Sequence, residues 1–171
     1  MSQNNKFIFL IPSTACRVFW ITFLLCLLAG LAIIYIIGPA IGVSENFGKA
    51  NDGYIQLAQN LGRGNGYIFE PDGPAVFHRP PLYPIILIPI MLLPEVLQWP
   101  ALILLQSIMT ALLGVILFKL TEKLFNTKTA AVATVIFLLN PWLYWYVKMP
   151  MTTIAQGLFY ILFIWQVVLL F

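Results

Sequence analysis

Charged residues are scarce in this chain of 171 residues, and cysteine and histidine are scarcer still. Only 9% of the residues are charged, whereas a typical soluble domain carries roughly 25%. The nine Lys and Arg residues are scattered, so they form no stripe that could neutralise a row of nucleic-acid phosphates. Two cysteines and one histidine give neither a disulfide framework nor the ligand spacing of a metal motif. These absences argue against a soluble domain, a nucleic-acid-binding protein and a zinc protein.

Apolar residues make up 61% of the chain, and they come in long runs. A soluble fold of this length could not bury so much apolar surface, and a run of about 18 residues with almost no charge indicates a helix that spans a bilayer. The predicted fold class is therefore all-α: a polytopic membrane helix bundle, formed by one membrane domain over residues 1–171 and surrounded by the lipid bilayer. About four spans are expected, at Val18–Ile37, Trp99–Phe118, Ala130–Tyr146 and Thr153–Phe171.

The distribution of basic residues predicts the orientation, because loops rich in Lys and Arg stay on the cytoplasmic side. Lys6 and Arg17 precede the first span, and the only other basic loop, Lys119–Lys128, follows the second. Both should face the cytoplasm, with residues 38–81 forming an external loop between the two spans. We expect a multi-pass protein of the bacterial inner membrane with a cytoplasmic N-terminus. A cleaved signal peptide is the alternative for the first run, which exceeds the usual length of roughly 7–15 apolar residues.

The segment Leu82–Leu93 is apolar but differs from the spans. It is short for a crossing, and Pro84 and Pro89 interrupt it. An even number of crossings must separate the two basic regions, and this holds if the segment only dips into the outer face of the membrane. The alternative is a short span kinked by its prolines.

The external loop concentrates charged residues, so function is expected there rather than in the spans. Its middle part is predicted to form a short amphipathic helix on the membrane surface. Asn51 or Asp52 would be the N-cap, and Gly62 would end the helix. The apolar face has the spacing i, i+3, i+4 and i+7, at Tyr54, Leu57, Ala58 and Leu61.

The last part of the external loop is stiff, because it is rich in proline. Proline fixes its own φ and pushes the preceding residue towards an extended conformation. In the string His78–Pro84, this effect should present His78 and Arg79 in a defined direction where the chain re-enters the membrane.

Several motifs, taken in order, point to a family. They are the strings Asn51–Leu61, Gly64–Tyr67 and Arg79–Pro84 in the external loop, followed by Lys119–Phe125 and Asn140-Pro141. Their order and spacing resemble those of the membrane glycosyltransferases of the C-type fold. That superfamily includes the protein O-mannosyltransferases and the aminoarabinose transferases of lipid A.

The resemblance implies transfer of a sugar from a polyprenyl-phosphate carrier to an acceptor glycan, lipid or protein at the external membrane face. An acidic residue in the first external loop is the family's catalytic position, which Asp52 matches. A carboxylate there could take the acceptor's proton while an oxocarbenium-like centre forms. The departing phosphate needs cations, for which Arg79 and Lys148 are the candidates. Tyr54 and His78 complete the expected substrate-binding residues.

This sequence departs from the family pattern in two places. Many relatives have a second acidic residue where Gly53 stands, and another where Met151–Thr153 stand. Family members are also much longer, so the chain resembles an N-terminal portion or a reduced relative. The alternative function is a non-catalytic membrane scaffold or partner subunit that retains the fold. A transporter is less favoured, because no ionisable residue lies in the middle of a predicted span.

Simpler interpretations exist for the candidate residues of the external loop. Asp52 could serve only as a helix cap, in which case Glu45 is the next candidate for the catalytic carboxylate. Arg79 could contact lipid headgroups instead of a carrier phosphate. His78 could pack under the loop without binding substrate.

Two further acidic residues, Glu70 and Asp72, flank a proline in a turn cluster. Solvated turn acids are the default interpretation of such a pattern. A weak divalent-metal role for these two residues is the only cofactor that the sequence leaves open, since a lone histidine is a poor basis for a zinc site.

Overall fold

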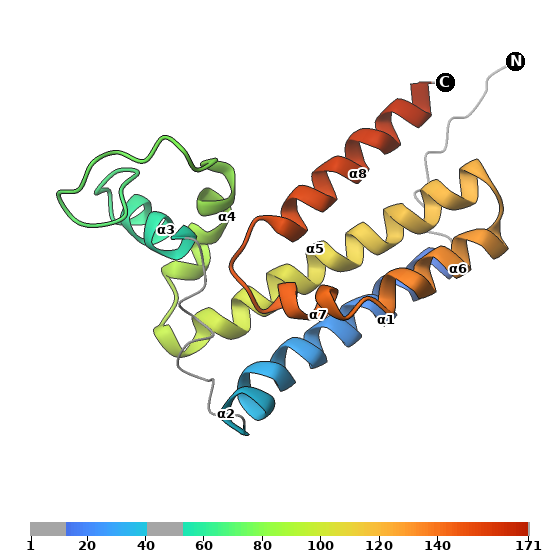
Figure 1. Ribbon diagram of the computed structural model, residues 1–171, viewed down its shortest axis with the longest axis horizontal. Helices are drawn as coiled ribbons and strands as arrows, with labels where there is room; N and C mark the ends of the chain where they lie inside the picture. The colour runs from blue at the N-terminus through green and yellow to red at the C-terminus, as the bar shows by residue number, and fades with distance from the viewer. Residues whose placement is uncertain (1–12, 41–52, 171) are drawn as a thin grey trace, which may run out of the picture.

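A computed structural model describes residues 13–40 and 53–170 of the chain (Figure 1). In these ranges the regular structure is helical, apart from an isolated antiparallel bridge between Ile68 and Ala75. The prediction of an all-α fold is confirmed. The helices, with η1 a π-helical stretch in the first span, are α1 (Ser13–Ala32), η1 (Ile33–Ile37), α2 (Gly38–Ala40), α3 (Tyr54–Gly62), α4 (Leu82–Met91), α5 (Glu95–Leu124), α6 (Thr127–Leu138), α7 (Pro141–Val147) and α8 (Thr153–Leu170).

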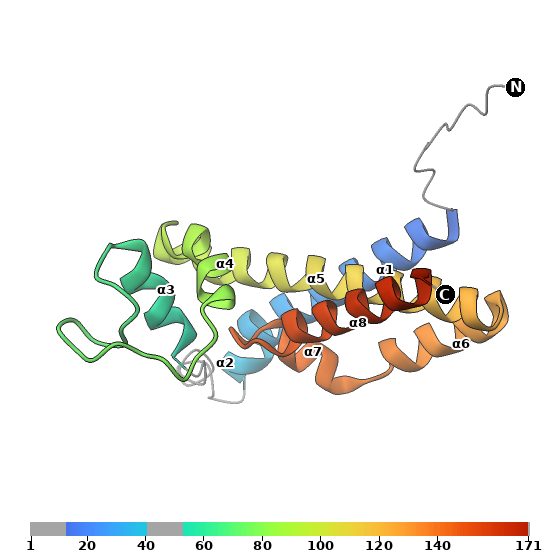
Figure 2. The same cartoon turned by 90° about the horizontal axis from the view of Figure 1, so that it is seen from above.

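Three stretches of helix are long and apolar enough to cross a membrane. They are Thr14–Ala40 with 27 residues, Glu95–Leu124 with 30 and Thr153–Leu170 with 18. At about 1.5 Å per residue, even the shortest approaches the roughly 30 Å thickness of the hydrocarbon core. α5 is the central helix and packs against α1, α6 and α8 (Figures 1 and 2). The architecture is therefore a polytopic membrane helix bundle.

The predicted third span, Ala130–Tyr146, is not one continuous helix. α6 and α7 together have the length of a span, but they are bent by 61° at the residues between them. Pro141 lacks an N–H donor and disfavours helical backbone at Asn140, so α6 cannot continue through these residues. The Asn140 side chain instead caps α7, because its oxygen accepts a hydrogen bond from the Trp142 N–H at 3.1 Å.

The start of α1, the turn between α5 and α6, and the end of α8 lie at the same end of the bundle (Figures 1 and 2). There the Lys123 ammonium donates a hydrogen bond of 3.1 Å to the Val168 carbonyl, which joins α5 to α8. Arg17 and the basic loop Lys119–Lys128 therefore lie at one end of the bundle, which we call the basic end. This placement is the one expected if an even number of crossings separates them.

α4 and the first turns of α5 form an antiparallel helical hairpin (Figure 1). The Gln98 amide on α5 donates to the carbonyls of Met91 and Leu93 at 3.3 and 3.0 Å, near the closed end of the hairpin. Pro84 lies in the first turn of α4, where a backbone N–H would have no helical partner. With 10 residues, α4 is about 15 Å long, half of the hydrocarbon thickness. That length suits a segment that dips into the membrane better than one that crosses it.

α3 corresponds to the amphipathic helix expected in the external loop, and it ends at Gly62 as predicted. Leu57 and Ala58 are fully buried, and α3 packs along α4. Protein therefore covers this apolar face, where the sequence suggested a membrane surface. The N-cap position is Gly53, with a left-handed φ of 81°, whereas the expected cap residues lie outside the described residues.

Candidate functional site

Tyr54, at the start of α3, brings together two segments that carry predicted site residues. The guanidinium carbon of Arg79 lies 5.5 Å from the centre of the Tyr54 ring, which is a cation–π contact. The same ring meets Tyr83 of α4 edge-on, with ring centres 5.4 Å apart. Both tyrosines are buried, with 4% and 3% of their surface exposed. Arg79 and Tyr54 are thus held together beside a tyrosine that was not among the predicted site residues.

Gln106 of α5 connects this cluster to the turn between α7 and α8. Its side-chain amide donates one hydrogen bond to the Tyr83 hydroxyl at 2.7 Å and one to the Met149 carbonyl at 2.9 Å. Gln106 itself is fully buried. Because Met149 directly follows Lys148, this hydrogen bond joins the segment of Lys148 to Gln106 and Tyr83.

Lys148 follows α7 and is almost completely buried, with 1% of its surface exposed. Its ammonium lies 3.7 Å from the centre of the Trp145 ring, which favours the charged form. Burial acts in the opposite direction and lowers the pKa of Lys148 to about 8. The ammonium therefore remains mostly protonated at neutral pH and begins to lose its proton just above it.

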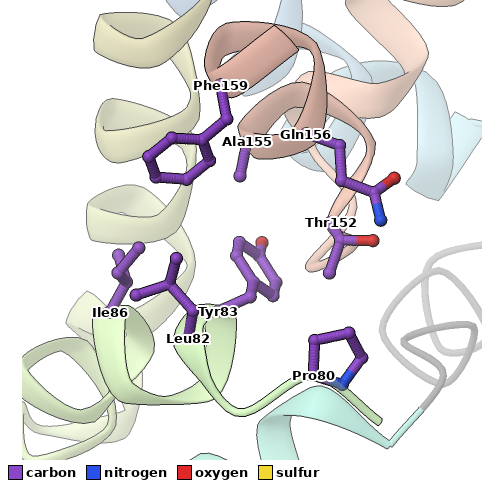
Figure 3. A pocket seen from close by; sticks show the side chains of 8 residues that line it. All are labelled: Pro80, Leu82, Tyr83, Ile86, Thr152, Ala155, Gln156 and Phe159. Carbon is purple, nitrogen blue, oxygen red and sulfur yellow. The ribbon is translucent and has the colours of Figure 1, made fainter. Parts of the chain in front are cut away.

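An apolar pocket with a volume of about 90 Å³ lies between the start of α4 and the start of α8 (Figure 3). α4 contributes Leu82, Tyr83 and Ile86 to its lining, and α8 contributes Ala155 and Phe159. Since Tyr83 also contacts Tyr54, the pocket shares a wall with the aromatic cluster. An apolar chain bound in this pocket could therefore lie near the pair formed by Tyr54 and Arg79.

Thr152, Gln156 and Pro80 complete the lining of this pocket. In Figure 3 the hydroxyl of Thr152 and the amide of Gln156 point away from the other lining side chains. Pro80 directly follows Arg79, so the segment that carries the cation borders the pocket. The surface of this small pocket is therefore almost entirely apolar, and polar groups lie only at its edge.

Tyr67 and Asn60 fix the backbone that presents Arg79, and sequence analysis did not single them out for this role. The Tyr67 hydroxyl lies 3.2 Å from the carbonyls of both Arg79 and Pro80 and donates to them. The Asn60 amide donates to the two successive carbonyls of residues 68 and 69, at 2.9 and 3.0 Å. The only sequence signal was the position of Tyr67 at the end of the Gly64–Tyr67 motif.

His78 does not join the cluster around Tyr54. It is exposed, and its ring centre lies 6.0 Å from that of Phe69. It lines a separate cavity of about 400 Å³, together with Phe69, Glu70 and Val76. The structure therefore brings together Tyr54, Arg79 and the Lys148 segment, but not His78.

Asp52 and Glu45, the predicted and the alternative catalytic carboxylates, lie outside the described residues. Gly53, which follows Asp52, has a positive φ of 81°, and a Cβ atom there would overlap the ring of Phe69. An acidic side chain at position 53, where many members of the resembled family carry one, would therefore require a strained backbone and a displaced Phe69 ring. At Met151–Thr153, where the family pattern has its other acidic residue, Thr152 lines the apolar pocket.

Glu70 and Asp72 lie in an exposed turn, which a hydrogen bond of 3.0 Å from the Gly73 N–H to the Glu70 carbonyl closes. Within residues 13–40 and 53–170, no three His, Cys, Asp or Glu side chains come together in a way that could hold a metal ion.

No protein-family model, curated protein or solved structure matches the chain. The resemblance to membrane glycosyltransferases rests on the sequence motifs. An assignment of activity therefore depends on the chemistry of the residues that the fold gathers.

Proposed function

We propose that the chain is a membrane glycosyltransferase, or the membrane part of one, which uses a polyprenyl-phosphate sugar at the external membrane face. The observation that supports this most is that Gln106 joins the segment that follows Arg79 to the segment of Lys148, from distant parts of the sequence, beside an apolar pocket. A lipid-linked phosphosugar likewise has a charged part and an apolar part, because its anionic phosphate adjoins an isoprenoid chain.

In the proposed reaction, the bond between the anomeric carbon of the sugar and the carrier phosphate breaks, and a bond to an acceptor oxygen or nitrogen forms. Arg79 and Lys148 would stabilise the negative charge on the departing phosphate. Asp52 would accept the proton that the acceptor loses. The Tyr54 ring orients the Arg79 guanidinium, and Tyr67 holds the backbone behind it.

The pocket between α4 and α8 would receive the first isoprenoid units of the carrier. Its α4 and α8 walls are apolar, and Phe159 is half exposed, at 49%. A chain bound there would leave the phosphate near Arg79, since Pro80 borders the pocket. The acceptor would approach from the side of Thr152 and Gln156.

The substitution Asp52→Asn tests the proposal, because it removes the proton acceptor while keeping the size of the side chain. Transfer of labelled sugar from a polyprenyl-phosphate sugar in membrane vesicles should fall by about a hundredfold or more, the usual contribution of a general base. Membrane insertion should be unchanged. Glu95→Gln, at an exposed acidic residue at the start of α5, is the matched control and should retain activity. Full activity in Asp52→Asn would remove this residue from the mechanism.

The second candidate function is a non-catalytic scaffold or partner subunit with the same fold. Two observations favour it: Phe69 packs against Gly53, where the family pattern has a second carboxylate, and Thr152 stands at the other departure from that pattern. It requires that the purified chain in nanodiscs turns over no polyprenyl-phosphate sugar and that a larger membrane protein co-purifies with it. Sugar transfer by the purified chain would exclude it.

A further inference from the structure

Gln106 has an unusual position for a polar residue. It lies on α5, inside a span, and none of its surface is exposed. Polar side chains are costly in such a place unless they pair, so they mark functional sites or helix contacts. Both protons of its amide are used, one by the Tyr83 hydroxyl at 2.7 Å and one by the Met149 carbonyl at 2.9 Å.

The two partners of Gln106 belong to the two segments that carry the cations. Tyr83 lies in the first turn of α4, just after the proline-rich string that begins with Arg79. Met149 is the next residue after Lys148. One amide on the central helix therefore sets the position of both segments relative to each other.

A simple helix tether does not explain Gln106. Gln98, on the same helix, already fastens α4 to α5 through the carbonyls of Met91 and Leu93. Gln106 instead reaches a third segment, and its Oε1 atom is buried without a hydrogen bond from any residue in the described ranges. A buried acceptor of this kind costs stability, so it calls for an explanation other than stability.

We infer that Gln106 is a positioning residue, which holds the Arg79 segment and the Lys148 segment at the separation that a lipid-borne phosphate requires. The inference takes the class of ligand from the proposed function. The separation itself is a property of the fold, and it can be measured without any ligand.

The first experiment measures this separation in the full chain in nanodiscs. Spin labels are attached to Phe77→Cys and Thr153→Cys, two exposed positions on either side of the site, with both native cysteines replaced. Double electron–electron resonance spectroscopy should give a narrow distribution of label-to-label distances for this protein and for the same protein with Gln98→Leu. Gln106→Leu should broaden or shift the distribution, because nothing then joins Tyr83 to the Met149 carbonyl.

The second experiment measures binding of farnesyl phosphate, with farnesol and inorganic phosphate as probes that carry only the chain or only the anion. Gln106→Leu should weaken farnesyl phosphate binding by about tenfold, the effect expected from one or two lost interhelical hydrogen bonds. Farnesol binding should not change. Gln98→Leu should leave the binding of farnesyl phosphate and of farnesol unchanged, because the hydrogen bonds of Gln98 lie at the far end of the α4–α5 hairpin.

An unchanged distance distribution in Gln106→Leu, or an unchanged affinity for farnesyl phosphate, would overturn the inference. If the unmodified chain does not prefer farnesyl phosphate to farnesol, the proposed function fails, and the distance measurement alone decides the role of Gln106. Should Gln106→Leu fail to fold, Tyr83→Phe takes its place, since it removes only the hydroxyl that Gln106 binds. A broadened or shifted distance distribution in Tyr83→Phe would then support the inference, and an unchanged one would overturn it.

Discussion

Lys148 and Arg79 are both cationic, but their surroundings make them respond differently to pH. Lys148 is buried, and burial lowers its pKa to about 8. Arginine side chains in general do not lose their charge in the pH range in which proteins are folded. Only one of the two proposed phosphate contacts therefore depends on pH near neutrality.

We expect farnesyl phosphate binding to weaken as the pH rises through about 8, because Lys148 then loses its charge. The phosphate itself is already doubly ionised, since its second pKa lies near about 6. Thermal stability should change in the opposite sense and rise above pH 8, because the unfolded chain binds the proton up to a higher pH than the folded one. Titration of both quantities in detergent checks this, and Lys148→Met should remove both dependences. Binding that stays constant across this range would exclude Lys148 from the phosphate site.

Gly53 and Gly64 form a matched pair for testing the packing of the external loop. Their φ angles are 81° and 80°, but a Cβ atom would overlap Phe69 only at Gly53, since nothing lies within 4 Å at Gly64. Gly64→Ala should cost about 1–2 kcal/mol for the left-handed backbone alone. Gly53→Ala should cost about 1–3 kcal/mol more for overpacking, measured by thermal unfolding in detergent. Equal losses in the two variants would show that Phe69 can move aside.

Among the elements, the sequence predicted the long helices better than the bent pair. Runs such as Trp99–Phe118 lie inside helices of the expected kind, because length and lack of charge are sufficient signals for a span. The Asn140-Pro141 pair was noted as a motif, and its effect on the backbone could have predicted the break between α6 and α7. The 61° bend itself depends on tertiary contacts, which no local pattern contains.

One such contact is the hydrogen bond of 2.6 Å from the Tyr144 hydroxyl to the Leu138 carbonyl. It pairs a carbonyl group that the end of α6 leaves without a helical partner, as backbone in an apolar environment requires. Tyr144→Phe should therefore lower the free energy of unfolding by about 1–2 kcal/mol. Tyr146→Phe, on the same short helix, is the control, because the Tyr146 hydroxyl makes no hydrogen bond with the described residues. Equal thermal unfolding of the two variants would mean that the break is stabilised in another way.

At the scale of the whole molecule, the sequence predicted which segments are helical spans and which charges share an end. The family resemblance suggested that Arg79 and Lys148 act on one phosphate, but no pattern in the sequence predicted the contacts that bring their segments together. Their meeting depends on Gln106, a single buried polar residue in a long apolar run, and on the edge contact between Tyr54 and Tyr83. Contacts of this kind between distant segments leave no periodic signal in the sequence.

The orientation of the bundle and the path of α4 can be tested together by cysteine labelling, after replacement of the native cysteines. Arg63, Glu95 and Lys128 are exposed and lie in the external loop, at the closed end of the α4–α5 hairpin and at the basic end. We expect a membrane-impermeant maleimide to label Arg63→Cys in intact cells and Lys128→Cys only after lysis. If α4 dips into the membrane, Glu95→Cys should not require lysis for labelling. If α4 crosses the membrane, Glu95→Cys becomes an internal position and Lys128→Cys an external one, which would separate the basic loop from Arg17 and refute the even number of crossings on which the external position of the site depends.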